Sequence, residues 1–261
     1  MTINRFIVCG DSYSEGMCDE IIDGQYRGWA DRVADELALH SDSFTYANLA
    51  IRGKTMAQVA KEQLDHALSM VTGPDTLISF HAGANDAIRP GYDAAATKKL
   101  YQECVRKVAA SGAKILLFTV LEDTGNTGKG SQIWKERFHD YNEAIWEVGR
   151  EVGATISDAN DLDFFKDNRF LAFDRLHLNE DGHWRVSQGV LEVLGMPYDA
   201  AWRTPLPPAT PTPWLRKRVE GVKWFFGFGL PWVWRRIRGV SSGDGRDPKY
   251  PQPVRWPLQS K

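Results

Sequence analysis

The stretch that decides the fold is V-C-G-D-S-Y-S-E-G-M, residues 8–17, which continues the apolar run 6–8. Such a run predicts a buried strand, and Gly-Asp-Ser ends the strand in a turn. A helix that begins near residues 14–15 would aim its backbone N–H groups and the positive end of its dipole at Ser12. Two interpretations follow: Ser12 is a reactive hydroxyl presented at a strand end, or it caps the helix.

Apolar runs alternate with segments of helical periodicity along residues 1–200. This alternation predicts a parallel sheet with helices on both faces, a flavodoxin-like three-layer α/β/α sandwich of the α/β class. Catalytic groups in such a sheet belong at the carboxyl ends of the strands. The expected strands are 6–9, 44–49, 76–80, 114–120 and 154–157, and the expected helices are 29–39, 56–70, 94–110, 133–152 and 181–194.

The composition changes after Gly195. Residues 205–213, P-L-P-P-A-T-P-T-P, hold five prolines in nine positions and predict an extended spacer. We therefore expect one domain over residues 1–200 and a C-terminal extension over residues 201–261, made of this Pro-rich linker and a basic, Trp-rich segment. The extension has twelve Lys and Arg against three Asp and Glu, a net charge of +9, whereas the domain carries a net −11.

Two interpretations of the extension remain open. Charged residues, glycines and Pro231 interrupt residues 219–237, so this span does not resemble a transmembrane helix. A basic segment rich in tryptophan could lie in a membrane interface. Alternatively, the extension docks on the domain, which carries the opposite charge, and we favour this interpretation.

Three cysteines, Cys9, Cys18 and Cys104, form no C-x-x-C pair, which argues against a disulfide framework and against a zinc site. The apolar run before Asp11 is too short for the core of a signal peptide. We expect a cytoplasmic protein without metal or cofactor. A net charge of −2 for the whole chain gives no indication of a nucleic-acid partner, and the oligomeric state stays open.

Two further stretches follow expected strands and could bring hydrogen-bond donors to Ser12. Residues 47–55, A-N-L-A-I-R-G-K-T, contain Gly53, whose backbone N–H could point into the same crevice. Residues 81–86, H-A-G-A-N-D, supply the side-chain amide of Asn85. Both would help to stabilise a negative charge that develops at a carbonyl oxygen.

A carboxylate and an imidazole lie three residues apart in F-D-R-L-H, residues 173–177. One turn of chain would let Asp174 hold one ring nitrogen of His177 while the other nitrogen faces Ser12.

With these four stretches the sequence strongly resembles the SGNH/GDSL family of serine hydrolases. The family's four blocks are matched in order by G-D-S-Y-S-E-G, N-L-A-I-R-G, G-A-N-D and D-R-L-H, and the resemblance covers roughly residues 4–195. It implies the SGNH hydrolase fold. The implied site residues are Ser12 as nucleophile, His177 as base, Asp174 as its orienting partner, and the Ser12 N–H, the Gly53 N–H and Asn85 as the oxyanion hole.

The resemblance also implies metal-independent hydrolysis of a small-molecule or lipid ester through an acyl-enzyme. A carbohydrate O-acetyl esterase and a lysophospholipase or thioesterase are alternatives within the same fold. A non-catalytic protein or a nucleotide-binding protein is a remote alternative. Residues 52–55, R-G-K-T, end like a phosphate-binding loop, but Asn48 stands where that motif needs its first glycine. No G-x-S-x-G occurs, which excludes the nucleophile elbow of α/β-hydrolases.

Other titratable residues near these motifs are interpreted as structural. The spacing of His183 from its acidic neighbours matches no common metal site. His81 is either a packing residue or part of the substrate pocket, and we favour the first interpretation. Asp11 and Asp86 adjoin the motif residues and are expected to accept hydrogen bonds within their turns.

Overall fold

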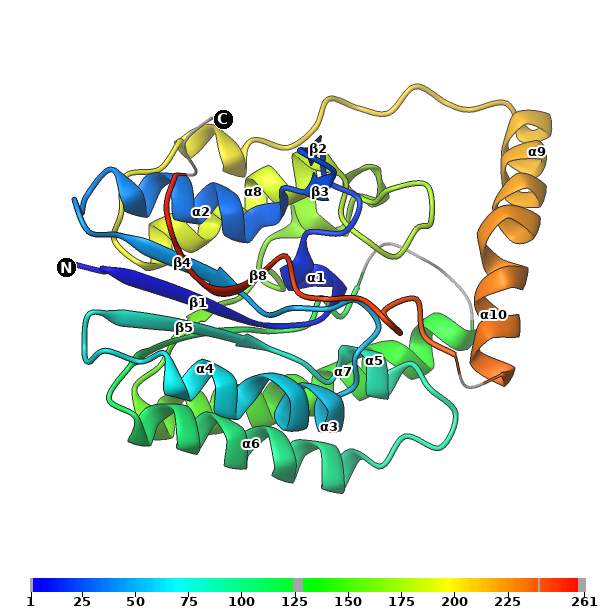
Figure 1. The fold of residues 1–261 in the computed structure, drawn as a ribbon. Coiled ribbons are helices and arrows are strands. Elements are labelled where there is room, and N and C mark those ends of the chain that lie inside the picture. Colours follow the sequence, from blue (N-terminus) through cyan, green and yellow to red (C-terminus); the bar gives the residue numbers. More distant parts are fainter. Residues whose placement is uncertain (1, 124–128, 239, 258–261) are drawn as a thin grey trace.

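The central sheet has six strands (Figure 1). The computed structural model describes residues 2–123, 129–238 and 240–257. Five parallel strands follow one another along the chain: β1 (Arg5–Gly10), β4 (Thr45–Asn48), β5 (Thr76–His81), β6 (Lys114–Phe118) and β7 (Thr155–Ser157). Together with β8 (Tyr250–Arg255), which runs antiparallel to β4, they lie in the order β7-β6-β5-β1-β4-β8.

Helices cover both faces of this sheet, which confirms the three-layer α/β prediction (Figure 1). The alternation along β1 shows why: Phe6 and Val8 pack into one core, and Ile7 and Cys9 pack into the other. One face carries α2 (Gly28–Ala38) and α8 (Glu180–Val193); the other carries α3 (Met56–Val59), a π-helical turn (Ala60–Leu64), α4 (Asp65–Ser69), α6 (Ala94–Ala110) and α7 (Lys129–Val152).

Short elements connect these layers. They are α1 (Ser12–Glu15), the two-stranded ribbon β2 (Ile21–Ile22) and β3 (Gln25–Tyr26), α5 (Ala84–Ala87), and the 3-10 turns Asp163–Lys166, Asn168–Phe170 and Ala200–Arg203. The ten strands and helices expected from the sequence are all present, and their ends differ from the expected ones by four residues or fewer.

The exit from β1 depends on close packing at Gly10. A Cβ atom on this residue would lie 2.6 Å from both the carbonyl oxygen of His81 and the hydroxyl of Ser14, so only glycine fits. Asp11 then caps α1, because its side chain accepts a hydrogen bond from the N–H of Tyr13 at 3.1 Å. The interpretation of Ser12 as the helix cap is therefore wrong, and Ser12 is the first residue of the helix.

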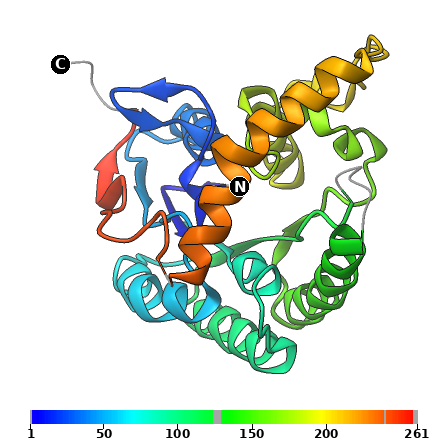
Figure 2. The same ribbon diagram turned by 90° about the vertical axis from the view of Figure 1, so that its right-hand side faces the viewer.

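The C-terminal extension runs across the carboxyl ends of the strands (Figure 2). It forms α9 (Trp214–Trp224), a π-helical turn (Phe225–Gly229), α10 (Leu230–Ile237) and finally β8. No helix among the described ranges is both long enough and apolar enough to cross a bilayer.

Buried polar contacts fasten the end of the extension to the domain. The ammonium group of Lys249 lies 2.8 Å from the carboxylate of Asp31, and these side chains are only 2% and 6% exposed. The indole of Trp256 donates to Asp35 at 2.8 Å. The extension therefore contacts the domain both through a sheet edge and through a buried ion pair.

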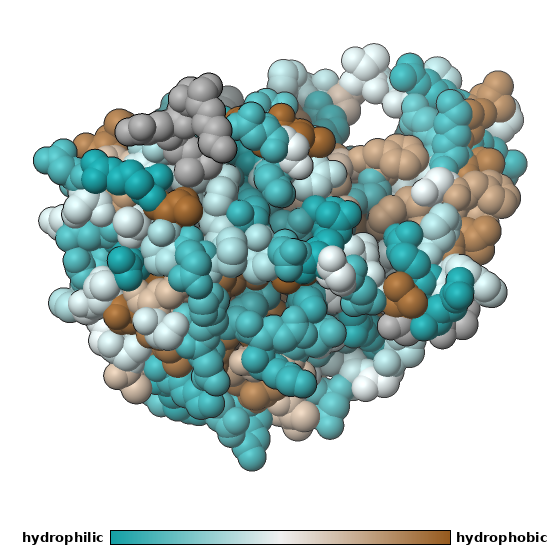
Figure 3. Space-filling model, in the orientation of Figure 1, coloured by the Kyte–Doolittle hydropathy of each residue, from teal (hydrophilic) through white to brown (hydrophobic). Residues whose placement is uncertain are grey.

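The outer face of α9 and α10 is apolar as well as basic. The most exposed hydrophobic side chains of these helices and of the π-helical turn between them have 57–70% of their surface accessible; they are Trp214, Leu215, Val222, Phe226 and Trp234. The space-filling view shows hydrophobic residues gathered on the side where these helices lie (Figure 3).

Candidate active site

Three side chains from two distant parts of the chain form a continuous hydrogen-bond relay. The ring nitrogen Nε2 of His177 lies 2.9 Å from the hydroxyl oxygen of Ser12, and Nδ1 of the same ring lies 2.6 Å from Oδ2 of Asp174. Ser12 is nearly buried, at 9% exposure. The structure thus brings together the serine, imidazole and carboxylate expected from the sequence.

The loop around Asp174 orients its carboxylate. Oδ1 accepts the backbone N–H groups of Leu176 and His177, both at 3.0 Å, while Oδ2 faces the imidazole ring. Burial opposes ionisation of this carboxyl group, but the hydrogen bonds and charge of His177 outweigh it and hold the pKa of Asp174 below its ordinary value. The group is therefore a carboxylate at neutral pH, and it fixes the Nδ1–H tautomer of His177.

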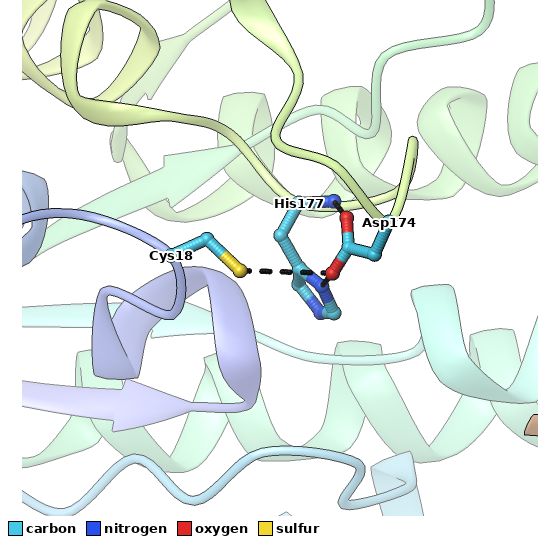
Figure 4. Close-up of side chains that lie close together, drawn as sticks. All are labelled: Cys18, Asp174 and His177. Carbon is cyan, nitrogen blue, oxygen red and sulfur yellow. Dashed lines mark hydrogen bonds and ion pairs between the residues drawn. The ribbon is translucent and has the colours of Figure 1, made fainter. Parts of the chain in front are cut away.

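The thiol of Cys18 also reaches this carboxylate. It donates to Oδ2 of Asp174 at 3.6 Å, from a segment that faces the loop carrying Asp174 and His177 (Figure 4). The ligand atoms of these three residues lie within 4.8 Å of one another, which is close enough for a metal ion. Burial, together with the neighbouring carboxylate, raises the pKa of Cys18 to about 12. The Cys18 thiol is therefore protonated at neutral pH and acts as a hydrogen-bond donor to the carboxylate.

The expected oxyanion-hole residues lie around one small pocket. Gly53 and Asn85 line a cavity of about 60 Å³ together with Ser12 and His177. The Asn85 amide already donates two hydrogen bonds there, to Oδ2 of Asp11 at 2.9 Å and to the carbonyl oxygen of Lys54 at 3.2 Å. It must give up one of these bonds to donate to a substrate oxygen.

Glu15 and Asp86 hold the loop that carries Gly53. Glu15 accepts the backbone N–H of Arg52 at 2.6 Å and forms an ion pair with the Arg52 guanidinium group. Asp11 accepts a hydrogen bond within its own turn, as expected. Asp86 instead accepts the N–H of Met56 at 2.8 Å, 30 residues earlier in the chain, so it links its turn to the segment that follows Gly53. Thr55 caps α3, which explains the end of the R-G-K-T stretch without a phosphate ligand.

Comparison with known proteins agrees with this geometry. The model of the GDSL-like lipase/acylhydrolase family matches residues 8–185, about two thirds of the chain. The chain belongs to this family. It is therefore a serine hydrolase that acts on carboxylic esters. No curated protein sequence matches it significantly.

Solved structures show that the hydrolase shares its fold with several esterases. An acetylxylan esterase from Geobacillus stearothermophilus is 16% identical, with a TM-score of 0.61, and the match covers 77% of this chain and all of that one. An alpha/beta hydrolase enzyme from the metagenome of Lake Arreo, Spain, is 18% identical, with a TM-score of 0.59, and the match covers 74% of this chain and 95% of that one. A psychrotrophic esterase from Pseudoalteromonas sp. is 19% identical, with a TM-score of 0.54, and the match covers 74% of this chain and 97% of that one. At these identities the likeness concerns the fold.

Two further histidines of the hydrolase lie close to the relay. His183 is buried, and its Nε2 lies 3.1 Å from the carbonyl oxygen of Met17, a contact that agrees with a structural role. His81 packs against the rings of Tyr13 and Phe118, with centroid distances of 4.7 and 6.0 Å, and it also lines a cavity that touches Ser12. Burial lowers the pKa of both histidines.

The extension of the hydrolase contributes residues that the sequence did not suggest. Trp224 donates its indole N–H to the carbonyl oxygen of Asp174 at 2.9 Å, and Phe228, Trp232 and Ser241 line the pocket of the candidate oxyanion hole. Gly53 has a φ of +74°, and a Cβ atom there would collide with Ser241. No motif in the sequence marks these contacts, because they depend on how the extension folds back.

Proposed function

We propose that Ser12 is the nucleophile of this ester hydrolase, with His177 as its general base. The observation that supports the assignment is the relay of 2.9 and 2.6 Å from the Ser12 hydroxyl through His177 to Asp174. In this scheme Nε2 takes the hydroxyl proton as Ser12 attacks the ester carbonyl, and the carboxylate stabilises the imidazolium that forms.

The proposed oxyanion hole consists of the N–H groups of Ser12 and Gly53 and the amide of Asn85. The common pocket of these three residues supports this assignment. The tetrahedral intermediate collapses when His177 protonates the leaving alcohol. Water then attacks the acyl-enzyme, with the imidazole again acting as base. In each of these reaction steps the imidazole of His177 accepts or donates the proton, so the proposed reaction needs no metal ion.

Covalent labelling tests the nucleophile. A small fluorophosphonate should modify Ser12, and peptide mass spectrometry locates the adduct. Ser12→Ala should lower kcat for p-nitrophenyl acetate by about three orders of magnitude or more, whereas Ser43→Ala, an exposed serine, serves as the control. An unlabelled Ser12, or near-normal turnover by the Ala variant, refutes the assignment.

We further propose that the enzyme works in the cytoplasm. The three cysteines are unpaired, which suits a reducing compartment. Cell fractionation with an antibody against the protein tests this localisation.

We also propose that the extension has two contact faces. Its inner face docks on the domain, as the Lys249–Asp31 pair and the Trp224–Asp174 bond support. Its outer face, which presents Trp214 and other exposed apolar side chains among basic ones, suits the surface of an anionic membrane.

A further inference from the structure

Cavities of different character surround Ser12. The small pocket that holds Gly53 and Asn85 has about 60 Å³ of space, and its wall mixes polar side chains such as Arg52 with apolar ones such as Phe228. A second cavity, here called the inner cavity, has about 200 Å³ and also touches Ser12, but apolar side chains such as Val120 and Leu178 form much of its wall. An ester bound at Ser12 thus has a polar and an apolar environment within reach.

A larger space, here called the outer cavity, adjoins the inner cavity. The outer cavity has a volume of about 680 Å³ and lies between the domain and the extension. Ile88, Leu121, Phe138 and Leu176 border both cavities, so the two meet at an apolar junction. The volume falls within the roughly 300–1,000 Å³ typical of pockets that bury most of a small ligand.

The extension supplies an aromatic wall of the outer cavity. Trp224, Phe228 and Trp232 follow one another at intervals of four residues, line the cavity and are partly buried. Phe226 and Trp234, two residues beyond the first and third of them, are 63% and 57% exposed. The hydrogen bond of Trp224 to Asp174 fixes this wall beside the relay.

We propose that the inner and outer cavities bind the acyl chain of the substrate, so that the enzyme prefers esters of medium-length or long apolar acids. This inference rests on the proposed nucleophile. During the reaction the acyl group stays bonded to Ser12 while the alcohol leaves, so an apolar space beside Ser12 suits the acyl chain. Each methylene that enters it should raise kcat/KM by up to about fourfold.

A pair of isomeric esters separates the acyl chain from the alcohol. Ethyl octanoate and octyl acetate contain the same atoms, but only the first carries its long chain on the acyl side. We expect ethyl octanoate to have the higher kcat/KM, by at least about tenfold, below the aggregation limit of both esters. Equal values, or a preference for octyl acetate, overturn the proposal.

Matched variants test the aromatic wall. Phe228→Ala and Trp232→Ala should lower kcat/KM for p-nitrophenyl octanoate at least about tenfold more than for p-nitrophenyl acetate. Phe226→Ala and Trp234→Ala remove the same side chains from the exposed face and should leave the octanoate-to-acetate ratio unchanged. If the two sets of variants behave alike, the wall does not bind the acyl chain.

The truncations to alanine could also detach the extension from the domain, so a second kind of variant fills the outer cavity instead of emptying it. Val233→Trp adds volume at the edge of the outer cavity and should also lower the octanoate-to-acetate ratio, with an unchanged thermal melt. An unchanged ratio contradicts the proposal. Fluorophosphonate labelling and turnover of p-nitrophenyl acetate by the unmodified enzyme test the nucleophile independently of chain length. If Ser12 is not labelled and acetate is not hydrolysed, the proposed function is refuted. If Ser12 is labelled but the enzyme shows no chain-length preference, only the proposal of an acyl-binding cavity is refuted.

Discussion

The indole nitrogen of Trp224 donates a hydrogen bond of 2.9 Å to the main-chain carbonyl oxygen of Asp174, 50 residues earlier in the chain. This bond joins the extension to the loop that carries the carboxylate and the imidazole of the relay. The guanidinium group of Arg175 also lies 5.2 Å from the centre of the Trp224 ring. The extension thus takes part in positioning the loop that carries Asp174 and His177.

Trp224→Phe should reduce kcat while KM for p-nitrophenyl acetate changes little. The variant keeps an aromatic ring but loses a hydrogen bond with a net value of about 0.5–1.5 kcal/mol, which corresponds to roughly 2–10-fold in rate if the loss falls on loop position. Steady-state kinetics measure the split between kcat and KM, and Trp214→Phe, at an exposed position, is the control. A rise in KM alone would indicate a substrate contact instead.

Asn85→Ala should lower kcat by roughly 10²–10³ with little change in KM, since in the proposed oxyanion hole its amide stabilises the negative charge that develops during the reaction. The two bonds of this amide, to Asp11 and Lys54, make it a support of the turn as well. Asn85→Asp, which keeps the size but removes the donor, should be at least as inactive. An effect confined to KM argues against the oxyanion role.

Lys249→Met should destabilise the protein by about 3–5 kcal/mol, because it leaves the buried carboxylate of Asp31 without its cation. Burial already raises the pKa of Asp31 to about 6 against the opposing effect of Lys249. Urea unfolding measures the change, and Lys166→Met, at an exposed ion pair, should leave the midpoint where it is. The double variant with Asp31→Asn should recover part of the loss.

Acidification should destabilise the fold through His183. Burial lowers the pKa of this histidine to about 4, whereas a histidine in an unfolded chain titrates near 6.5. Between these values the unfolded chain binds a proton that the folded chain does not. The contribution of neutral His183 to the free energy of unfolding is therefore fully present above about pH 6.5 and is lost as the pH drops toward 4. Denaturant melts should show a shallower dependence for His183→Gln than for the exposed control His40→Gln.

The outer face of the extension should bind anionic vesicles. We expect co-sedimentation with vesicles that contain phosphatidylglycerol, weaker binding at high salt, and little binding to neutral vesicles. Replacing both Trp214 and Phe226 with serine should reduce the bound fraction, because these apolar side chains are free to enter the interface. Salt-independent binding, or none by the intact protein, contradicts the two-face proposal.

The parallel core could be predicted from the sequence because its residues follow simple periods. The side chains of Phe6 and Val8 alternate with those of Ile7 and Cys9, and glycine at position 10 marks the strand exit. Four short motifs at the ends of the strands are then enough to predict that Ser12, Asp174 and His177 lie close together.

The extension could not be predicted in the same way. Pro251 and Pro253 make β8 look like a loop, since proline cannot donate to a sheet; an edge strand tolerates them because only one side is paired. The glycines between α9 and α10 also weaken any helical pattern, and the structure accommodates them in the π-helical turn Phe225–Gly229. The contact of Cys18 with Asp174 has no local signal at all.

The pairing of β4 with β8 has a consequence for biosynthesis. Thr45 pairs with Arg255, so some two hundred residues must follow β4 before its outer edge finds its partner. At about 5–20 residues per second, translation of that interval takes at least about ten seconds. Throughout this time an extended segment with free backbone donors and acceptors is open to pairing with another chain. The exposed edge of β4 therefore needs chaperone protection most while the chain is still being synthesised. A fusion or truncation that disturbs residues 250–255 prolongs the time during which this edge is unpaired.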